Sequence, residues 1–417
     1  MPFQTVQSSN VERQGIDIYI YSLNHVRSVS EFIRSIRSGI GQGYQEFSIH
    51  WAGQSAAVFP NACVPIASAI EYYKQNGIDF YYDIDPSNYL SKCYFSTPQY
   101  YTSDEITLLA SPFDQIVKYN NSSQVAAFTQ RCVDSISHQT VCEDGILESL
   151  IWCINEVMDN VLVHSNSDFG YVLAQFHSNS KHIALCISDA GIGIFNSLKR
   201  GAHHPKRAID ALTLSIQEGI GDGQGQGNGL FGLNQIVKSN GGRLTLTSGP
   251  ASIMMVGNDA IRKYDYLPYI DQLYQGTNVD FQLDLNKKVD LKTAFSSIGG
   301  FDGFDIRIDD MLQENDTLLY DVFEHCEGTA TREAGRLLRN DILNTLRRSK
   351  KRMILDFSNI ATVSSSFIDE LVAKLIIEMG IISFNQMIML WGVNETVKYL
   401  CERSVYMRIF EEWKAKG

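Results

Sequence analysis

The apolar pattern near the N-terminus predicts a small α/β domain over residues 1–95. Residues 15–22 alternate between apolar and polar side chains, as a strand does, and residues 29–38 carry apolar side chains at helical spacing. A second strand (EFSIHWAG), a helix over residues 61–75 and a third short strand near IDFYYD follow. Strands that alternate with helices are typical of an α/β unit.

The last segment, residues 303–417, has the same alternation. FDIRID, MILDFSNI and NQMIMLWGV read as strands, and TREAGRLLRNDILNTLRRS and SSSFIDELVAKLIIEMG read as helices. The segment VFPNACVPIASAIEYYKQNGI near the N-terminus is similar to VSSSFIDELVAKLIIEMGI, since both run from small residues into an apolar helix that ends at Gly-Ile. We interpret the two ends as copies of one α/β plan, although two helices of similar length can also match this well by chance.

The central segment, residues 110–286, contains a polar stripe on an apolar helix. In ILESLIWCINEVMDNVLVHS the side chains of Glu156, Asn160 and His164 are each four apart, opposite an apolar face. Such a stripe alone is usually a solvated helix face. A Glu and an Asn one turn apart also suit a nucleotide site, because Glu can deprotonate a water and the Asn oxygen can bind Mg²⁺.

Two strands follow this helix, GYVLAQFH and HIALCIS, and the second ends in Asp189-Ala-Gly191-Ile-Gly193. The run IALCI is apolar at every position, which predicts a strand buried on both faces. An Asp at its end could accept a hydrogen bond from the exocyclic amine of adenine, and the glycines would let the backbone pass close to a base.

A glycine-rich loop runs directly into another helix in GIGDGQGQGNGLFGLNQIVKSNGG. So many glycines make poor helix or strand, but they suit a loop that wraps phosphates. The amides at the N-terminus of the next helix would face an anion with the helix dipole behind them. A plain glycine linker would leave that immediate helix unexplained.

In order along the chain, these elements resemble the boxes of the gyrase, heat-shock chaperone, histidine kinase and MutL (GHKL) ATPases. The resemblance implies Asn160 as the Mg²⁺ ligand, Glu156 as the general base and Asp189 as the adenine acceptor. It places Thr277, of the final Gly-Thr element, beside the adenine contact. The residues that it implies as the pocket lining are Gly191, Gly193, Gly227, Gly229 and Leu230. Residues 195–224 would form a lid, in which the basic residues Lys199, Lys206 or Arg207 could reach phosphate or remain surface charges.

Two features depart from that family. Residues 250–275 separate RLTLTSG from the Gly-Thr element, where the family usually turns quickly, so we expect them to cover the pocket or to form a partner surface. His138, in DSISHQT, has no acidic residue directly after it. Autophosphorylation on histidine, as in a sensor kinase, is therefore not expected.

The C-terminal segment resembles the STAS-like domains of bacterial regulators through ILDFSNIATVSSSFIDEL. In the anti-sigma-factor antagonist branch, a serine in an Asp-Ser-Ser-Gly turn accepts phosphate. Here Ser364 stands in place of the aspartate and Phe367 in place of the glycine. Ser364 or a neighbouring serine could instead simply cap the helix.

Composition limits the remaining choices. The net charge of −12 repels nucleic acid, and the basic run at residues 347–352 complements the end of a helix dipole. The eight cysteines include no Cys-x-x-Cys pair, which favours reduced, buried thiols in a cytoplasmic protein. No apolar run reaches about 18 residues, and no secretory signal precedes the first strand, so no membrane partner is expected.

The sequence therefore predicts an α/β protein, an α+β sandwich, with a central Bergerat-type ATPase domain between two small STAS-like domains. We expect ATP and Mg²⁺ as cofactors, slow hydrolysis, and protein partners bound through the flanking domains. Two alternatives stay open: a serine protein kinase that acts on a STAS module, and an interaction module that binds ATP without hydrolysing it. A homodimer is compatible with either.

Overall fold

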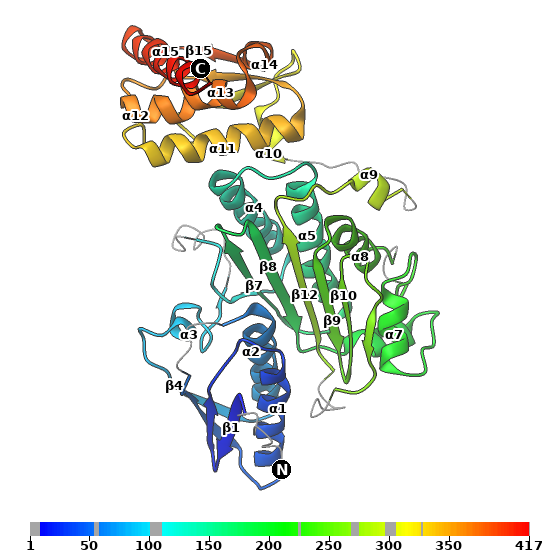
Figure 1. Cartoon of the computed structure of the whole chain (residues 1–417). Coiled ribbons are helices and arrows are strands. Elements are labelled where there is room, and N and C mark those ends of the chain that lie inside the picture. The colour runs from blue at the N-terminus through cyan, green and yellow to red at the C-terminus, as the bar shows by residue number, and fades with distance from the viewer. Residues whose placement is uncertain are drawn as a thin grey trace, which may run out of the picture. The chain divides into compact units, whose positions relative to one another are not determined.

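The computed structural model describes residues 9–53, 58–100, 111–223, 227–267, 275–296, 306–326 and 328–416. The chain divides into two compact units. One consists of Met1–Val133 with Glu148–Phe301, and the other of Asp134–Leu147 with Asp302–Gly417. Both combine helices with a sheet (Figure 1), which confirms the predicted α/β fold class.

The first unit begins with a four-stranded sheet in the order β1-β2-β3-β4. Its elements are β1 (Val11–Gln14), β2 (Asp17–Ile20), α1 (Arg27–Ile40), β3 (Glu46–Trp51), α2 (Pro60–Gln75), β4 (Asp79–Asp83) and α3 (Tyr89–Lys92). Strands β2, β3 and β4 are parallel, whereas β1 pairs with β2 in an antiparallel hairpin. The hydrophobic pattern predicted β2 to β4 and both long helices, but it missed the short strand β1.

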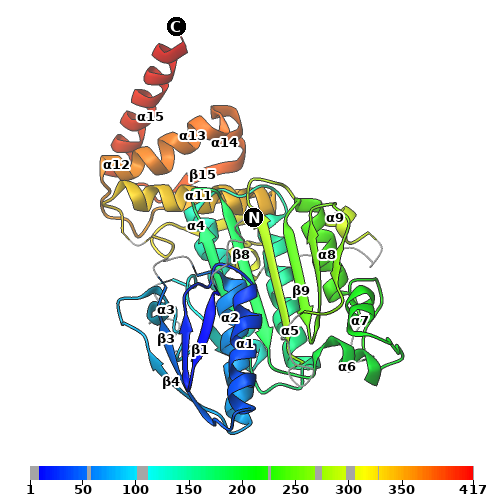
Figure 2. The ribbon, with the colours of Figure 1, turned by 60° about the horizontal axis from the view of Figure 1, so that its bottom comes forward.

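Helix α2 is covered on both sides, and every residue from Ala62 to Ile70 is buried. Cys63, Val64 and Ile66 are fully buried, and a helix without a polar face belongs in an interior. The helix packs on α1 and β4 and also on β7 (Gly170–His177) and β8 (His182–Asp189) of a second sheet (Figure 2). The N-terminal segment and this sheet therefore share one hydrophobic core.

The second sheet has eight strands in the order β11-β10-β9-β12-β8-β7-β6-β5. The remaining strands are β5 (Gln99–Tyr100), β6 (Val117–Tyr119), β9 (Arg243–Ser248), β10 (Ala251–Val256), β11 (Arg262–Tyr264) and β12 (Thr277–Asp284). Every residue of β8 from Ile183 to Asp189 is buried, as its continuous apolar pattern predicted. Strands β10 and β11 lie in the predicted 250–275 insertion and extend the sheet at one edge, while residues 268–274 of that insertion lie outside the described residues.

The helices of this part are α4 (Ser122–Gln139), α5 (Ile146–His164), α6 (Gly193–Arg200), α7 (Ala208–Ser215), α8 (Gly229–Asn240) and α9 (Leu291–Ala294). Side chains alternate across β8, so Cys186 belongs to the core that contains α2. Ile187 and Asp189 point to the opposite face and line a cavity together with α5. The sheet is thus the middle layer between α2 and α5.

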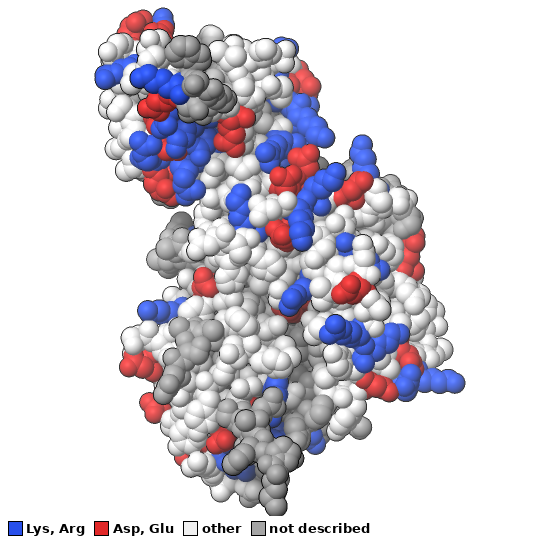
Figure 3. Space-filling model, in the orientation of Figure 1, with Lys and Arg blue, Asp and Glu red and all other residues white. Residues whose placement is uncertain are grey.

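The second unit contains a three-stranded parallel sheet in the order β13-β14-β15. Its elements are α10 (Ile306–Met311), β13 (Thr317–Asp321), α11 (Arg332–Ser349), β14 (Arg352–Asp356), α12 (Ser365–Ile368), a π-helical turn (Asp369–Ala373), α13 (Lys374–Met379), α14 (Ile381–Met387), β15 (Ile388–Trp391) and α15 (Glu395–Lys416). Lys and Arg lie beside Asp and Glu on the face of this unit in Figure 3. Within this unit, the buried Glu370 pairs with Arg332 and with Arg339, each at 2.7 Å.

Two predicted strands of this unit need correction. The predicted strand FDIRID overlaps helix α10 (Ile306–Met311), which forms because Ile308 and Met311 reach the core at helical spacing. The strand is β13, where Leu318 and Tyr320 are buried at a spacing of two. In NQMIMLWGV, helix α14 continues to Met387, so β15 is shorter than predicted.

The polar face of α11 binds the backbone of the segment that joins α4 to α5. The amide nitrogen of Asn344 donates to the carbonyl oxygens of Ser137 and Thr140 at 2.9 and 2.8 Å. Its amide oxygen accepts from the backbone N–H of Cys142 at 2.8 Å. The start of α5 is therefore held inside the second unit.

Asp341 lies one turn before Asn344 and is fully buried. It accepts hydrogen bonds from the hydroxyls of Ser137 and Tyr320 at 2.7 and 2.6 Å, and it pairs with the Arg307 guanidinium. Burial alone would raise the pKa of Asp341, but the charge of Arg307 holds it well below its usual range. The contact between α11 and the segment that joins α4 to α5 thus contains a buried, charged network around Asp341. We call this contact the joint.

The substitution Asp341→Asn should destabilise the second unit by about 3 to 5 kcal/mol, because it removes the buried carboxylate that pairs with the mostly buried guanidinium of Arg307. Native-state hydrogen exchange over residues 332–349 measures this loss. Asp316→Asn, which removes an exposed ion pair with Lys351, should cost less than about 1 kcal/mol. Equal effects of the two substitutions would contradict the assigned importance of the network.

A second prediction concerns Asp280 on β12, which faces α2 and accepts from Asn61 at 3.3 Å. Burial raises the pKa of Asp280 to about 7. The folded protein therefore binds a proton here more tightly than the unfolded chain, so this group costs stability as the pH rises from about 4 to 7. Asp280→Asn should stabilise the first unit by about 1 to 3 kcal/mol at pH 8 and by less at pH 5. Thermal unfolding at the two pH values checks this, and a gain that does not depend on pH would refute it.

Candidate functional site

A cavity of about 520 Å³ lies between α5 and the sheet in the first unit. Its walls also include α6, residues 220–222 and 227–228 of the glycine-rich loop, and the start of α8. The sequence-predicted site residues that line it are Glu156, Asn160, Asp189, Gly193, Gly227, Gly229, Leu230 and Thr277. Of the predicted set only Gly191 is not part of this lining.

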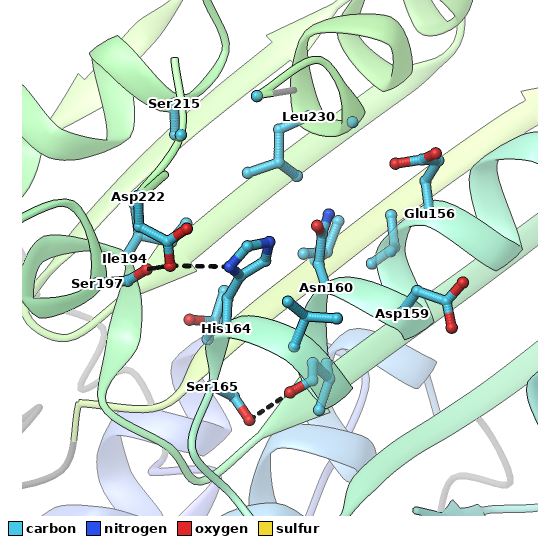
Figure 4. A pocket seen from close by; sticks show the side chains of 18 of the residues that line it. Glu156, Asp159, Asn160, His164, Ser165, Ile194, Ser197, Ser215, Asp222 and Leu230 are labelled. Atoms are coloured by element: carbon cyan, nitrogen blue, oxygen red, sulfur yellow. Dashed lines mark hydrogen bonds and ion pairs between the residues drawn. The ribbon is translucent and has the colours of Figure 1, made fainter. Parts of the chain in front are cut away.

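Helix α5 presents three of its polar side chains to this cavity. Glu156, Asn160 and His164 follow one another along one face (Figure 4). Burial raises the pKa of Glu156, the nearby charge of Asp159 raises it further, and His164 opposes both. A carboxylate with a raised pKa is a stronger base than an exposed one, so Glu156 is suited to accept a proton from water.

The end of β8 places a buried carboxylate at the wall formed by the sheet. Asp189 is 3% exposed, and its Oδ1 accepts the backbone N–H of Gly191 at 2.7 Å and that of Thr277 at 3.4 Å. Burial raises the pKa of Asp189 to about 6. The hydroxyl of Thr277 lies 3.1 Å from that of Ser248, which in turn accepts from the N–H of Ile194 at 2.9 Å. The strand ends around Asp189 are therefore fixed by hydrogen bonds.

The two glycines after Asp189 have different tasks. A Cβ on Gly191 would lie 2.1 Å from the backbone oxygen of Ser165, so this glycine lets the end of β8 approach the end of α5. Gly193 has a φ of +73°, and its Cβ would lie 2.2 Å from the backbone oxygen of Gln275. Gly191 thus allows two elements next to the cavity to pack closely, whereas Gly193 itself lines the cavity.

The described part of the glycine-rich loop has a defined shape, and residues 224–226 lie outside it. Gly227 has a φ of +71° and packs against the backbone of residues 219–221. The side-chain oxygen of Asn228 accepts the N–H of Gly219 at 3.0 Å. A Cβ on Gly229 would lie 2.6 Å from a carboxylate oxygen of Glu156 and 3.2 Å from the amide nitrogen of Asn160. The N-terminus of α8 therefore abuts the Glu156–Asn160 pair.

The structure also shows a cluster to which the sequence reading gave no role. Asp222 lies in the glycine-rich loop, where it accepts from His164 Nδ1 and from the Ser197 hydroxyl, each at 2.8 Å (Figure 4). The sequence contained two signals for this cluster. One is Asp222, the acidic residue among the glycines of GIGDGQG, and the other is His164, the third member of the helical stripe. Their pairing spans 58 residues of chain, which no local pattern reveals.

The basic residues proposed for the lid do not line the described cavity. Lys199 lies over the ring of Phe195, 4.7 Å from its centroid. Arg207 is exposed and pairs with Asp210 and Asp265, each at 2.8 Å. Lys206 is exposed as well.

In the second unit, the serine turn before α12 has a structural role. The hydroxyl of Ser364 caps the helix by accepting the N–H of Phe367 at 3.0 Å. Residues 334–398 match the STAS-like domain of unknown function (DUF4325). The STAS-like resemblance of the C-terminal segment is thereby confirmed. The comparisons found no matching curated protein and no matching solved structure.

The N-terminal segment has three neighbouring parallel strands, as the STAS-like unit does. The two helical segments whose sequences are similar also occupy matching places in the chain. Helix α2 lies between β3 and β4, and α12 with α13 lies between β14 and β15. That the N-terminal segment is a second STAS-like domain stays a prediction. Among the described residues, no helix is both long and apolar enough to cross a membrane.

Gly193→Ala should destabilise the first unit by about 2 kcal/mol or more, because both its φ and the Gln275 oxygen exclude a side chain. Gly219→Ala provides a matched control, since its φ of +70° is similar but nothing lies within 4 Å of its Cβ. Thermal unfolding of the two variants separates the cost of contact from the cost of backbone strain. Equal losses would show that the approach of Gln275 does not matter.

Proposed function

We propose that the cavity binds Mg-ATP and that the chain is an ATP-dependent switch, with slow hydrolysis, that controls its STAS-like unit. The observation that carries the proposal is the arrangement of the lining. A buried carboxylate on β8, a Glu–Asn pair on α5 and a glycine-rich loop at a helix N-terminus all meet at one cavity. Its volume is within the range of about 300–1,000 Å³ that ligand sites occupy.

The proposed adenine end lies at Asp189 and Thr277. The carboxylate is buried beside apolar Ile187 and Val279, so a flat heterocycle could pack there while its exocyclic amine donates to Asp189. Gly193, which also lines the cavity, lets the backbone oxygen of Gln275 approach this wall closely. These features support an aminopurine over a base without a donor at that position.

The proposed phosphate end lies where α8 abuts α5. The backbone N–H groups that begin α8 and the preceding glycines suit an anion. Asn160 would hold Mg²⁺ through its amide oxygen, and the bound ion would neutralise phosphate charge. Glu156 would orient a water and take its proton, for which its raised pKa is suitable.

Helix α5 supports the switch, because its two ends belong to different units. It starts at Ile146 in the segment that α11 binds and ends at His164 in the cavity lining. A shift of α5 on nucleotide binding would therefore act directly on the connector held by Asn344 and Asp341. The STAS-like match supports a regulatory output through protein partners.

Two other functions remain as test outcomes. Transfer of labelled phosphate from ATP to Ser364, Ser365, Ser366 or a separate STAS module would favour a serine kinase. ATP binding without turnover, even with partner proteins added, would favour an interaction module that uses ATP as a structural ligand.

Calorimetric titration of the full chain with Mg-ATP tests the site. Asp189→Asn should weaken binding about tenfold to hundredfold, because a charged acceptor for the base amine is lost. Asn160→Ala should weaken binding and reduce its dependence on Mg²⁺. Glu156→Gln should still bind but should hydrolyse ATP about a hundredfold more slowly.

Asp259→Asn, an exposed change outside the cavity lining, is the control and should bind as the wild type does. No binding of ATP by the wild type would overturn the proposal. Full hydrolysis by the Glu156→Gln variant would overturn the role of Glu156 alone.

A further inference from the structure

The glycine-rich loop is attached to the cavity wall through the side chain of Asp222. That side chain is 8% exposed, although the loop lies at the protein surface. Its Oδ2 accepts from His164 on α5 and from Ser197 on α6 at 2.8 Å each. Because an ionised carboxylate only accepts hydrogen bonds, Nδ1 of His164 carries the proton in this contact.

The backbone of Asp222 is fixed as well. A Cβ on Gly201, directly after α6, would lie 2.7 Å from the Cα and from the carbonyl oxygen of Asp222. The loop therefore rests on the end of α6, while its side chain reaches α5. Helix α5, helix α6 and the loop meet at this one residue.

We propose that Asp222 is a positioning residue that holds the glycine-rich loop over the polyphosphate of the bound nucleotide. The inference rests on the proposed nucleotide site and adds a residue to it. Asp222 acts through His164 and Ser197 by setting where the loop amides stand, and it makes no contact with the phosphates itself.

Electrostatics and the positioning role predict opposite changes in ATP affinity when the Asp222 carboxylate is removed. The cavity is also lined by the carboxylates of Glu156, Asp159 and Asp189 and by the imidazole of His164. By charge alone, a further carboxylate repels a polyanion, so its removal should tighten binding of ATP. If Asp222 positions the loop, its removal should weaken binding instead. The two roles therefore predict opposite changes.

The decisive experiment compares ATP with adenosine, which lacks phosphates, by calorimetry in the presence of Mg²⁺. Asp222→Asn should lower the affinity for ATP about tenfold and leave that for adenosine unchanged, because only the loop contacts are lost. Ser197→Ala keeps the charge of Asp222 and removes one donor to it, so it should lower the ATP affinity about threefold. Asp159→Asn also removes one carboxylate from the cavity lining, and by charge it should tighten ATP binding.

Hydrogen exchange of the loop gives a second readout. In the ATP-bound Asp222→Asn variant, residues 216–223 should exchange faster than in the bound wild type. Tighter ATP binding by this variant would overturn the positioning role, and so would an equal loss of ATP and adenosine binding. If the wild type binds adenosine but not ATP, the loop has no phosphate to cover and the inference fails. If it binds neither ligand, the proposed function fails first.

Discussion

The burial of β8 on both faces is the constraint on which the rest of the first unit depends. The two faces of this strand contact different elements, and its side chains alternate between them. Cys186 therefore packs toward α2, while Ile187 and Asp189 line the cavity. Its neighbour β12 divides in the same way, with Thr277 and Val279 at the cavity and Asp280 toward α2. A change in how α2 packs would therefore reach the strands that carry Asp189 and Thr277. The N-terminal segment is part of the structure that shapes the site.

Helix α5 imposes the second constraint, because a single helix connects a buried polar joint with the cavity. The segment just before the helix is bound at Cys142 by Asn344 and at Ser137 by Asp341, through hydrogen bonds that are specific in direction. Apolar packing could slide by a fraction of a turn, whereas such a joint tolerates little displacement without losing a buried bond. These buried hydrogen bonds therefore fix the segment that precedes the helix more firmly than apolar packing would.

The sequence singled out many of the residues that line the cavity, because most of their signals are local. Glu156 and Asn160 are one turn apart, Asp189 ends an apolar strand, and Gly229 begins a helix, so short windows carry each feature. What it missed depends on distant pairs, such as Asp222 with His164, and on the packing of α2 against the sheet. The error at α10 has a different cause: six residues can fit both a period of two and a helical period, and tertiary packing decided between them.

The charge of the cavity narrows what the site can accept. Glu156, Asp159, Asp189 and Asp222 contribute four carboxylates, and the residues that line the described cavity include no Lys or Arg. At separations of several ångströms, each unpaired carboxylate would oppose a polyphosphate by about 1 kcal/mol or more, even when water screens the interaction. His164 is already engaged with Asp222, so it offsets part of one charge. If a polyphosphate binds here as proposed, a cation must accompany it to offset this charge, and the amide oxygen of Asn160 is the ligand proposed for that ion. Without that ion, the same cavity would favour a neutral nucleoside.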